Sequence, residues 1–107
     1  MRFNRKRHSS RHGKILIVDD EPTILKLLSK ILMQAHFKVE VARSGEEGIE
    51  KIADNILKLI ITDIKMSGVN GIQVMAYSRA KDNLIPVIGI SGTPWFMDED
   101  LFDAVLY

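Results

Sequence analysis

Short apolar runs rich in β-branched residues alternate along this chain with segments of helical periodicity, and each run ends in polar residues. A continuous apolar run of this kind, closed by acidic or turn-forming residues, is typical of a strand buried on both faces. Strands that alternate with helices predict a parallel sheet with right-handed crossovers, in the doubly wound α/β class. The expected strands cover residues 15–18, 37–42, 57–62 and 86–90, and residues 103–107 form a fifth.

Helical signals lie between these strands. Pro22 suits a first helical turn, and the apolar residues after it have the spacing of a helix that packs one face on a sheet: Ile24, Leu27, Leu28, Ile31 and Leu32. Ser44 and Glu47 have the spacing of a capping box before a second helix. A third helix is expected over residues 71–81. The chain therefore has the strand–helix period that a doubly wound fold needs.

Polar residues close three of the strands: Asp19 and Asp20 the first, Asp63 the third and Ser91 the fourth. An Asp pair after a strand is often only a turn or a helix cap. In this fold class, however, the carboxyl ends of the strands form the ligand-binding edge. Carboxylates that converge there repel one another unless a cation lies among them, and Mg²⁺ is the divalent cation that prefers such oxygen ligands. Asp63, the single acid at the end of a central strand, is the candidate nucleophile toward phosphoryl groups.

Three sequence blocks, residues 14–22, 63–71 and 85–92, resemble the receiver domain of two-component response regulators in order and spacing. The resemblance runs from Lys14 to Gly92 and implies a flavodoxin-like sheet of strand order 2-1-3-4-5, the order given in general for this fold. It implies that Asp63 accepts a phosphoryl group from a sensor histidine kinase or a phosphotransfer protein. It also implies a switch hydroxyl at Ser91 and Mg²⁺ as cofactor, with four metal ligands: Asp19 largely through water, Asp20, Asp63 and the backbone carbonyl of Lys65.

The sequence departs from the family pattern mainly near its end. Ser67 stands where the family usually has Pro, and Gly92 where it usually has Ala. Only sixteen residues follow Ser91, so we expect a shortened fourth helix and no fifth helix. The family's Lys-Pro pair would begin directly after Tyr107, and Val105 stands at the position of the family's switch aromatic. We expect either a fragment of a longer protein or an oligomer, such as a homodimer, that covers the exposed sheet.

Charge divides the chain into two parts. Residues 1–14 hold six Lys and Arg and no acid, whereas residues 15–107 hold the other 9 basic residues and all 14 acids. Residues 1–13 are interpreted as a basic tail or leader, and residues 14–107 as one receiver domain, incomplete at its C-terminus. Nucleic-acid binding by this chain alone is not expected, because the tail has a single aromatic residue, Phe3, to stack on a base.

Composition excludes several other classes of protein. With 46% hydrophobic residues the chain can bury a core, but no apolar run approaches the roughly 20 residues of a membrane span. The absence of cysteine excludes disulfides and thiolate catalysis, and with the polar N-terminus it favours a cytoplasmic location. We expect a phosphoacceptor switch that turns over no external substrate. Two alternatives stay open: a pseudo-receiver used only for binding or dimerisation, and a small metal-dependent phosphatase.

Overall fold

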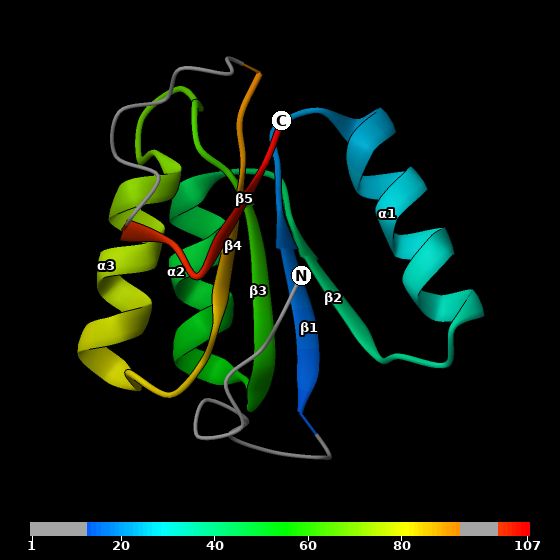
Figure 1. Cartoon of the computed structure of the whole chain (residues 1–107), viewed down its shortest axis with the longest axis horizontal. Helices are drawn as coiled ribbons and strands as arrows, with labels where there is room; N and C mark the ends of the chain where they lie inside the picture. Colours follow the sequence, from blue (N-terminus) through cyan, green and yellow to red (C-terminus); the bar gives the residue numbers. More distant parts are fainter. Residues whose placement is uncertain (1–12, 93–100) are drawn as a thin grey trace.

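Five parallel strands form one sheet in the order β2-β1-β3-β4-β5 in a computed structural model, which describes residues 13–92 and 101–107 (Figure 1). The elements alternate as the sequence predicts and have these bounds: β1 Lys14–Val18, α1 Pro22–Gln34, β2 Val39–Ala42, α2 Gly45–Asp54, β3 Leu57–Asp63, α3 Gly71–Lys81, β4 Val87–Ile90 and β5 Ala104–Leu106. The predicted fold class and strand order are confirmed.

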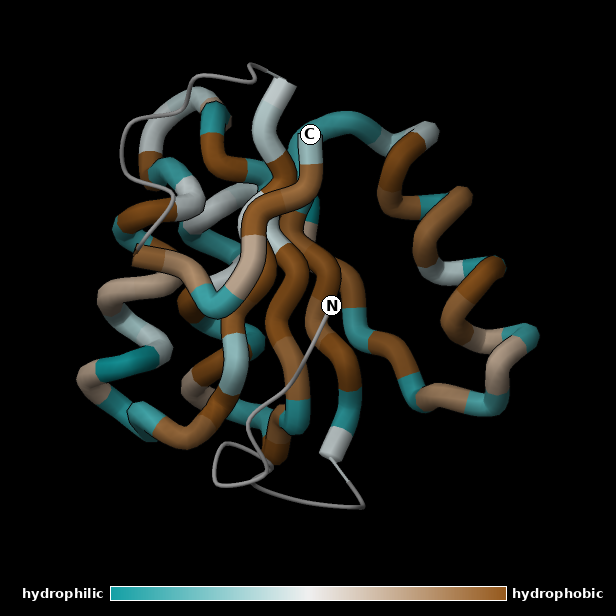
Figure 2. Tube along the Cα trace, viewed as in Figure 1, coloured by the Kyte–Doolittle hydropathy of each residue, from teal (hydrophilic) through white to brown (hydrophobic). Residues whose placement is uncertain are grey.

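The sheet is covered on both faces (Figure 1). Helix α1 lies on one face, and α2 and α3 lie side by side on the other. Because successive strand residues point to opposite faces, β1 contributes to two cores. Leu16 and Val18 pack with Ile52 of α2 and Val74 of α3, while Ile17 packs toward Leu25 of α1. Figure 2 shows the resulting apolar interior, with the hydrophobic colour concentrated along the central strands.

The predicted apolar stripe of α1 is only partly correct. Leu28 and Leu32 do pack toward the sheet, but Leu27 and Ile31 are 53% and 51% exposed. The residue that α1 buries most deeply is Leu25, at 5% exposure. Helix α1 carries apolar residues over more of its circumference than one sheet contact can cover, so spacing alone does not identify the buried stripe.

Local signals set the helix ends. The Ser44 hydroxyl accepts a hydrogen bond from the Glu47 amide at 3.1 Å, which confirms the predicted start of α2. Helix α1 begins with Pro22 in its first turn. The second strand begins at Val39, two residues later than predicted, because His36 has a left-handed backbone with φ of 70° and Phe37 still belongs to the turn.

The last strand lies at the sheet edge next to β4, with Ala104 opposite Ile88. The predicted shortened fourth helix, in the segment of residues 92–102, and the predicted basic tail of residues 1–13 lie almost entirely outside the described residues. None of the described helices combines the length and the apolar composition of a membrane-spanning segment.

Candidate functional site

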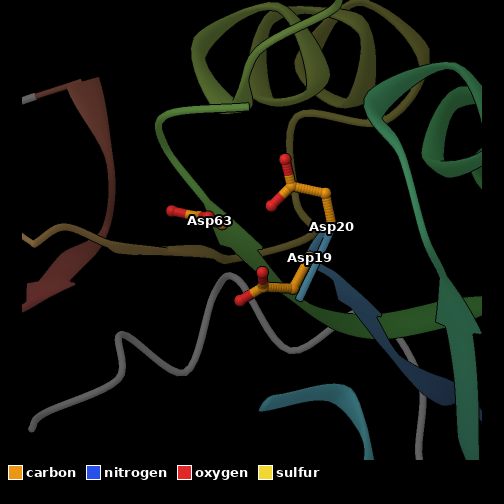
Figure 3. Close-up of side chains that lie close together, drawn as sticks. All are labelled: Asp19, Asp20 and Asp63. Carbon is orange, nitrogen blue, oxygen red and sulfur yellow. The ribbon is translucent and has the colours of Figure 1, made fainter. Parts of the chain in front are cut away.

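Three carboxylates meet at the carboxyl ends of β1 and β3. Asp19 and Asp20 follow β1 directly, and Asp63 is the last residue of β3. Since Val18 pairs with Thr62 in parallel register, Asp19 and Asp63 lie at the same level of neighbouring strands. Each of the three residues offers a carboxylate oxygen, and these oxygens all lie within 4.8 Å of one another. Figure 3 shows the three side chains extending to the same side of the strand ends.

The Asp63 carboxylate is half-buried, and its pKa is raised to about 6. Burial is the largest cause, and the negative charges of Asp19 and Asp20 raise the pKa further. Hydrogen bonds from the backbone amides of Lys65 and Ile64 act in the opposite direction. Without a cation, the surroundings of Asp63 therefore disfavour the ionised form of its carboxylate.

Asp19 is the most deeply buried of the three acids, at 3% exposure. Burial raises its pKa, and the charges of Asp20 and Glu21 add to that effect. The Glu21 amide donates a hydrogen bond to Asp19 Oδ1 at 2.9 Å and so orients the carboxylate. Asp20, by contrast, is exposed. The cluster thus combines one fixed and buried acid, one half-buried acid and one acid open to solvent.

The donor set fits a hard divalent cation such as Mg²⁺. It consists of carboxylate oxygens only, and a cation among them would relieve the repulsion that raises the pKa of Asp63 and of Asp19. Within the described residues, Asp19, Asp20 and Asp63 would hold the ion. The backbone carbonyl of Lys65 as a fourth ligand stays a prediction; Lys65 itself lies in the exposed loop that follows Asp63.

The loop between Asp63 and α3 is held at both ends. At its start the Ile64 amide donates to the Ile90 carbonyl of β4 at 2.9 Å, and the Ile64 carbonyl accepts from the Gly71 amide at 2.9 Å. At its end Asn70 and Gln73 form a capping box, each side chain accepting from the other's backbone amide, at 3.0 and 2.9 Å. The sequence contained a signal for this second box, the Asn-x-x-Gln spacing, that the prediction did not use.

Two further residues that support the site were also missed by sequence reasoning. Thr62, fully buried in β3, donates its hydroxyl to the Asp63 carbonyl at 3.0 Å. Glu46 in the first turn of α2 accepts the Val69 amide at 2.8 Å. The Thr62 contact is local, but the Glu46 contact joins helix α2 to the loop before α3, 23 residues away in the sequence, so no spacing pattern predicts it.

Ser91 lies at the same edge of the sheet. It follows β4, in which Ile90 is opposite Asp63, so Ser91 lies one residue beyond the level of the phosphoacceptor candidate on the neighbouring strand. Ser91 is 7% exposed, and its amide donates to the Leu106 carbonyl of β5 at 2.8 Å. The structure thus places the predicted switch residue between the acid cluster and the edge strand.

Comparisons with known proteins agree with this arrangement. The family profile described as the response regulator receiver domain matches residues 15–102. The alkaline phosphatase synthesis transcriptional regulatory protein PhoP of Bacillus subtilis is 33% identical over 93 residues, which cover 87% of this chain and 37% of PhoP. The transcriptional regulatory protein GlrR of Escherichia coli is 34% identical over 80 residues, 75% of this chain and 18% of GlrR. The chain thus spans about a third or less of the length of these relatives.

Solved structures show the same fold. The response regulator TrrA of Thermotoga maritima, crystallised in complex with Mg²⁺-BeF, has a TM-score of 0.81 at 29% identity, with 88% of this chain and 84% of TrrA covered. A response regulator receiver domain from Clostridium thermocellum also has a TM-score of 0.81, at 27% identity, with 88% and 80% covered. The profile match and the homology to response regulators such as PhoP do not favour a pseudo-receiver. The chain belongs to the family of response regulator receiver domains.

Proposed function

We propose that this receiver domain accepts a phosphoryl group on Asp63 from a phosphohistidine of a sensor histidine kinase or a phosphotransfer protein. The observation that carries the proposal is the position of Asp63. Its carboxylate lies at the end of a central strand, with the acids Asp19 and Asp20 within 4.8 Å. On this proposal the chain is a signalling switch and not an enzyme that turns over an external substrate.

The chemical step is a displacement at phosphorus. One carboxylate oxygen of Asp63 forms a bond to the phosphorus atom while the bond from phosphorus to the donor nitrogen breaks. The electron pair of that bond stays on the imidazole nitrogen, which then takes up a proton. The ionised carboxylate is a much stronger nucleophile than the protonated acid, so the protonation state of Asp63 matters. With its pKa near 6, Asp63 is mostly ionised at neutral pH even without a bound ion.

Mg²⁺ is the proposed cofactor, held by Asp19, Asp20 and Asp63 with the Lys65 carbonyl. When bound, it supplies charge neutralisation for the phosphoryl oxygens at the acid cluster. The supporting observation is the oxygen-only donor set, together with the raised pKa of Asp63 and of Asp19 in the ion-free protein.

Ser91 is the proposed switch hydroxyl. Its backbone amide is bonded to Leu106, so a movement of Ser91 toward a phosphorylated Asp63 would act on the edge strand β5.

We place the chain in the cytoplasm, where the kinase domain would meet it. We also propose that two copies of the chain form a homodimer through apolar side chains left exposed on the α1 face.

The test is phosphorylation by acetyl phosphate with Mg²⁺, followed by intact-mass measurement of the full chain. We expect one phosphoryl group on the parent protein and none on Asp63→Asn. The matched control is Asp54→Asn, which changes an exposed aspartate at the end of α2 and should be phosphorylated as the parent is. A phosphorylated Asp63→Asn variant would refute the assignment of Asp63, and a parent that stays unmodified would support the pseudo-receiver alternative.

A further inference from the structure

A side chain of α2 binds the backbone of the loop that follows Asp63. Glu46 Oε1 accepts the amide of Val69 at 2.8 Å, across 23 positions of sequence. Next to this bond, Gly68 has a left-handed backbone with φ of 74°, and a Cβ there would lie 3.0 Å from the same oxygen. Gly45 also touches the loop, because a Cβ on it would lie 2.1 Å from the Val69 carbonyl oxygen. The first turn of α2 and residues 68–69 therefore form one close contact.

This contact acts on the segment that holds the proposed phosphoacceptor. The loop starts at Asp63, and its Lys65 backbone amide lowers the pKa of the Asp63 carboxylate against the effect of burial. The described bonds of Ile64 fix the start of the loop, and the Asn70 capping box fixes its end. Glu46 adds a bond to Val69, the residue before Asn70 and next to Gly68, whose left-handed backbone suits glycine.

We propose that Glu46 is a positioning residue, which fixes the loop of residues 65–69 so that its backbone is arranged for Mg²⁺ and for a phosphoryl group at Asp63. The part of the inference that concerns phosphorylation rests on the proposed function. The part that concerns Mg²⁺ does not, because Mg²⁺ binding can be measured without any phosphoryl donor. Residues outside a metal's own ligand shell commonly set its affinity by orienting the ligands.

A purely structural role for Glu46 predicts a different result. An acid in the first turn of a helix also stabilises that helix by its charge. Glu46→Gln separates the two roles, because it removes the charge but keeps an oxygen that can accept the Val69 amide. Glu46→Ala removes both. Glu50→Ala is the matched control, since Glu50 is an exposed acid one turn later on the same helix.

The experiment measures the full chain and these three variants. Amide NMR spectra report the Val69 proton, Mg²⁺ titration followed by the same spectra gives the dissociation constant, and reaction with acetyl phosphate gives the phosphorylation rate. For Glu46→Ala we expect an upfield shift of the Val69 amide proton, weaker Mg²⁺ binding by about three- to tenfold, and a phosphorylation rate lower by a similar factor. For Glu46→Gln and Glu50→Ala, the Mg²⁺ dissociation constant and the phosphorylation rate should stay within about twofold of the parent values. A difference of that size is comparable to experimental scatter.

The outcomes are distinct. Unchanged Mg²⁺ affinity in Glu46→Ala, with or without a lower melting temperature, would show that Glu46 only supports the helix and would overturn the inference. Equal losses in Glu46→Ala and Glu46→Gln would overturn it as well, because the charge and not the hydrogen bond would then matter. If acetyl phosphate fails to modify the parent, the proposed function fails, while the Mg²⁺ titration still decides the role of Glu46.

Discussion

A Cβ placed on Gly71 would lie 2.3 Å from the backbone carbonyl oxygen of Asp63. The first residue of α3 therefore packs directly on the backbone of the proposed phosphoacceptor, and the Gly71 amide is bonded to the next carbonyl, that of Ile64. Glycine is needed here for space and not for an unusual φ. Any larger residue must move either the helix or the end of β3.

Gly71→Ala is therefore expected to destabilise the protein by about 1 to 3 kcal/mol, the usual cost of overpacking a rigid site. The reason is that the clashing atoms belong to the backbone and cannot rotate away. Thermal or urea unfolding measures the loss. Gly92→Ala is the control, since a Cβ there meets nothing within 4 Å among the described residues, and the stability should change by about 0.5 kcal/mol or less. Equal effects of the two substitutions would contradict the packing described here.

The stability of the metal-free protein should depend on the ionisation of Asp63. The pKa is near 6 in the folded chain and about 3.9 in an unfolded one, so the folded state binds the proton more tightly. The contribution of Asp63 to stability is then fully present below about pH 4 and is lost as the pH rises through about 6. We expect a loss of about 1 to 2 kcal/mol, less than the full shift because Asp63 is partly exposed.

Asp63→Asn isolates this contribution. Measured without divalent ions, the difference in unfolding free energy between the variant and the parent should favour the variant more at pH 7 than at pH 4. Asp54→Asn serves as the exposed control and should show no such pH trend. A difference between Asp63→Asn and the parent that is the same at both pH values would mean that neither burial nor the neighbouring carboxylates raise the pKa of Asp63 in the folded protein.

Mg²⁺ should reverse this loss by binding the folded state alone. Adding the ion at pH 7 is expected to raise the melting temperature of the parent and to leave that of Asp20→Ala nearly unchanged. Asp20 is the best residue to change because it is exposed, so its removal leaves no cavity in the core. Glu21→Ala, which alters the next acid but keeps the amide bonded to Asp19, is the control. Equal stabilisation of Asp20→Ala and the parent would locate the ion elsewhere.

Asp103 should be important for holding the edge strand. Its Oδ2 accepts the Val87 amide at 2.7 Å and pairs with Arg79 Nη2 at 3.3 Å, and its own amide donates to the Val87 carbonyl. Asp103→Ala is expected to cost about 1 to 3 kcal/mol, because it leaves the Val87 amide without this acceptor. Arg79→Ala should cost about 1 kcal/mol or less, as partly exposed ion pairs do. Urea unfolding of both variants tests this order, and the reverse order would refute it.

Apolar side chains on the α1 face should promote self-association of this chain. Leu27 and Ile31 of α1 are about half exposed, and so is Leu106 in β5, which points to the same face as Ala104. Light scattering over a concentration series should show a mass that rises above that of a monomer, and Ile31→Lys should reduce the rise. Ile56→Lys, at an exposed residue in the α2–β3 connection, is the control. A constant monomer mass would contradict the prediction.

The sequence was sufficient to predict the fold because its signals are local. The strands β1, β3 and β4 are apolar runs closed by polar residues, and parallel pairing then brings Asp19, Asp20 and Asp63 to one edge without further information. The start of α2 was predictable for the same reason, since Ser44 and Glu47 are three residues apart.

Contacts that depend on how separate segments approach one another were not predictable. Nothing in the residue pattern places Glu46 against Val69, or Asp103 against Arg79 and Val87. The same holds for α1, where packing of the helix on the sheet buries Leu25 and leaves Leu27 exposed. These details depend on how separate segments pack together, and the spacing of residues along one segment carries no information about that packing.

The parallel pairing of β1 and β3 also determines when the acids meet during folding. Asp20 and Asp63 are separated in the chain by two helices and the whole of β2, so they approach only after a long loop has closed. Their repulsion is absent from the unfolded chain and appears with the β1–β3 ladder. Protonation of Asp63 therefore reports when the ladder forms. It accelerates folding if the ladder forms before the transition state, and it slows unfolding if the ladder forms afterwards.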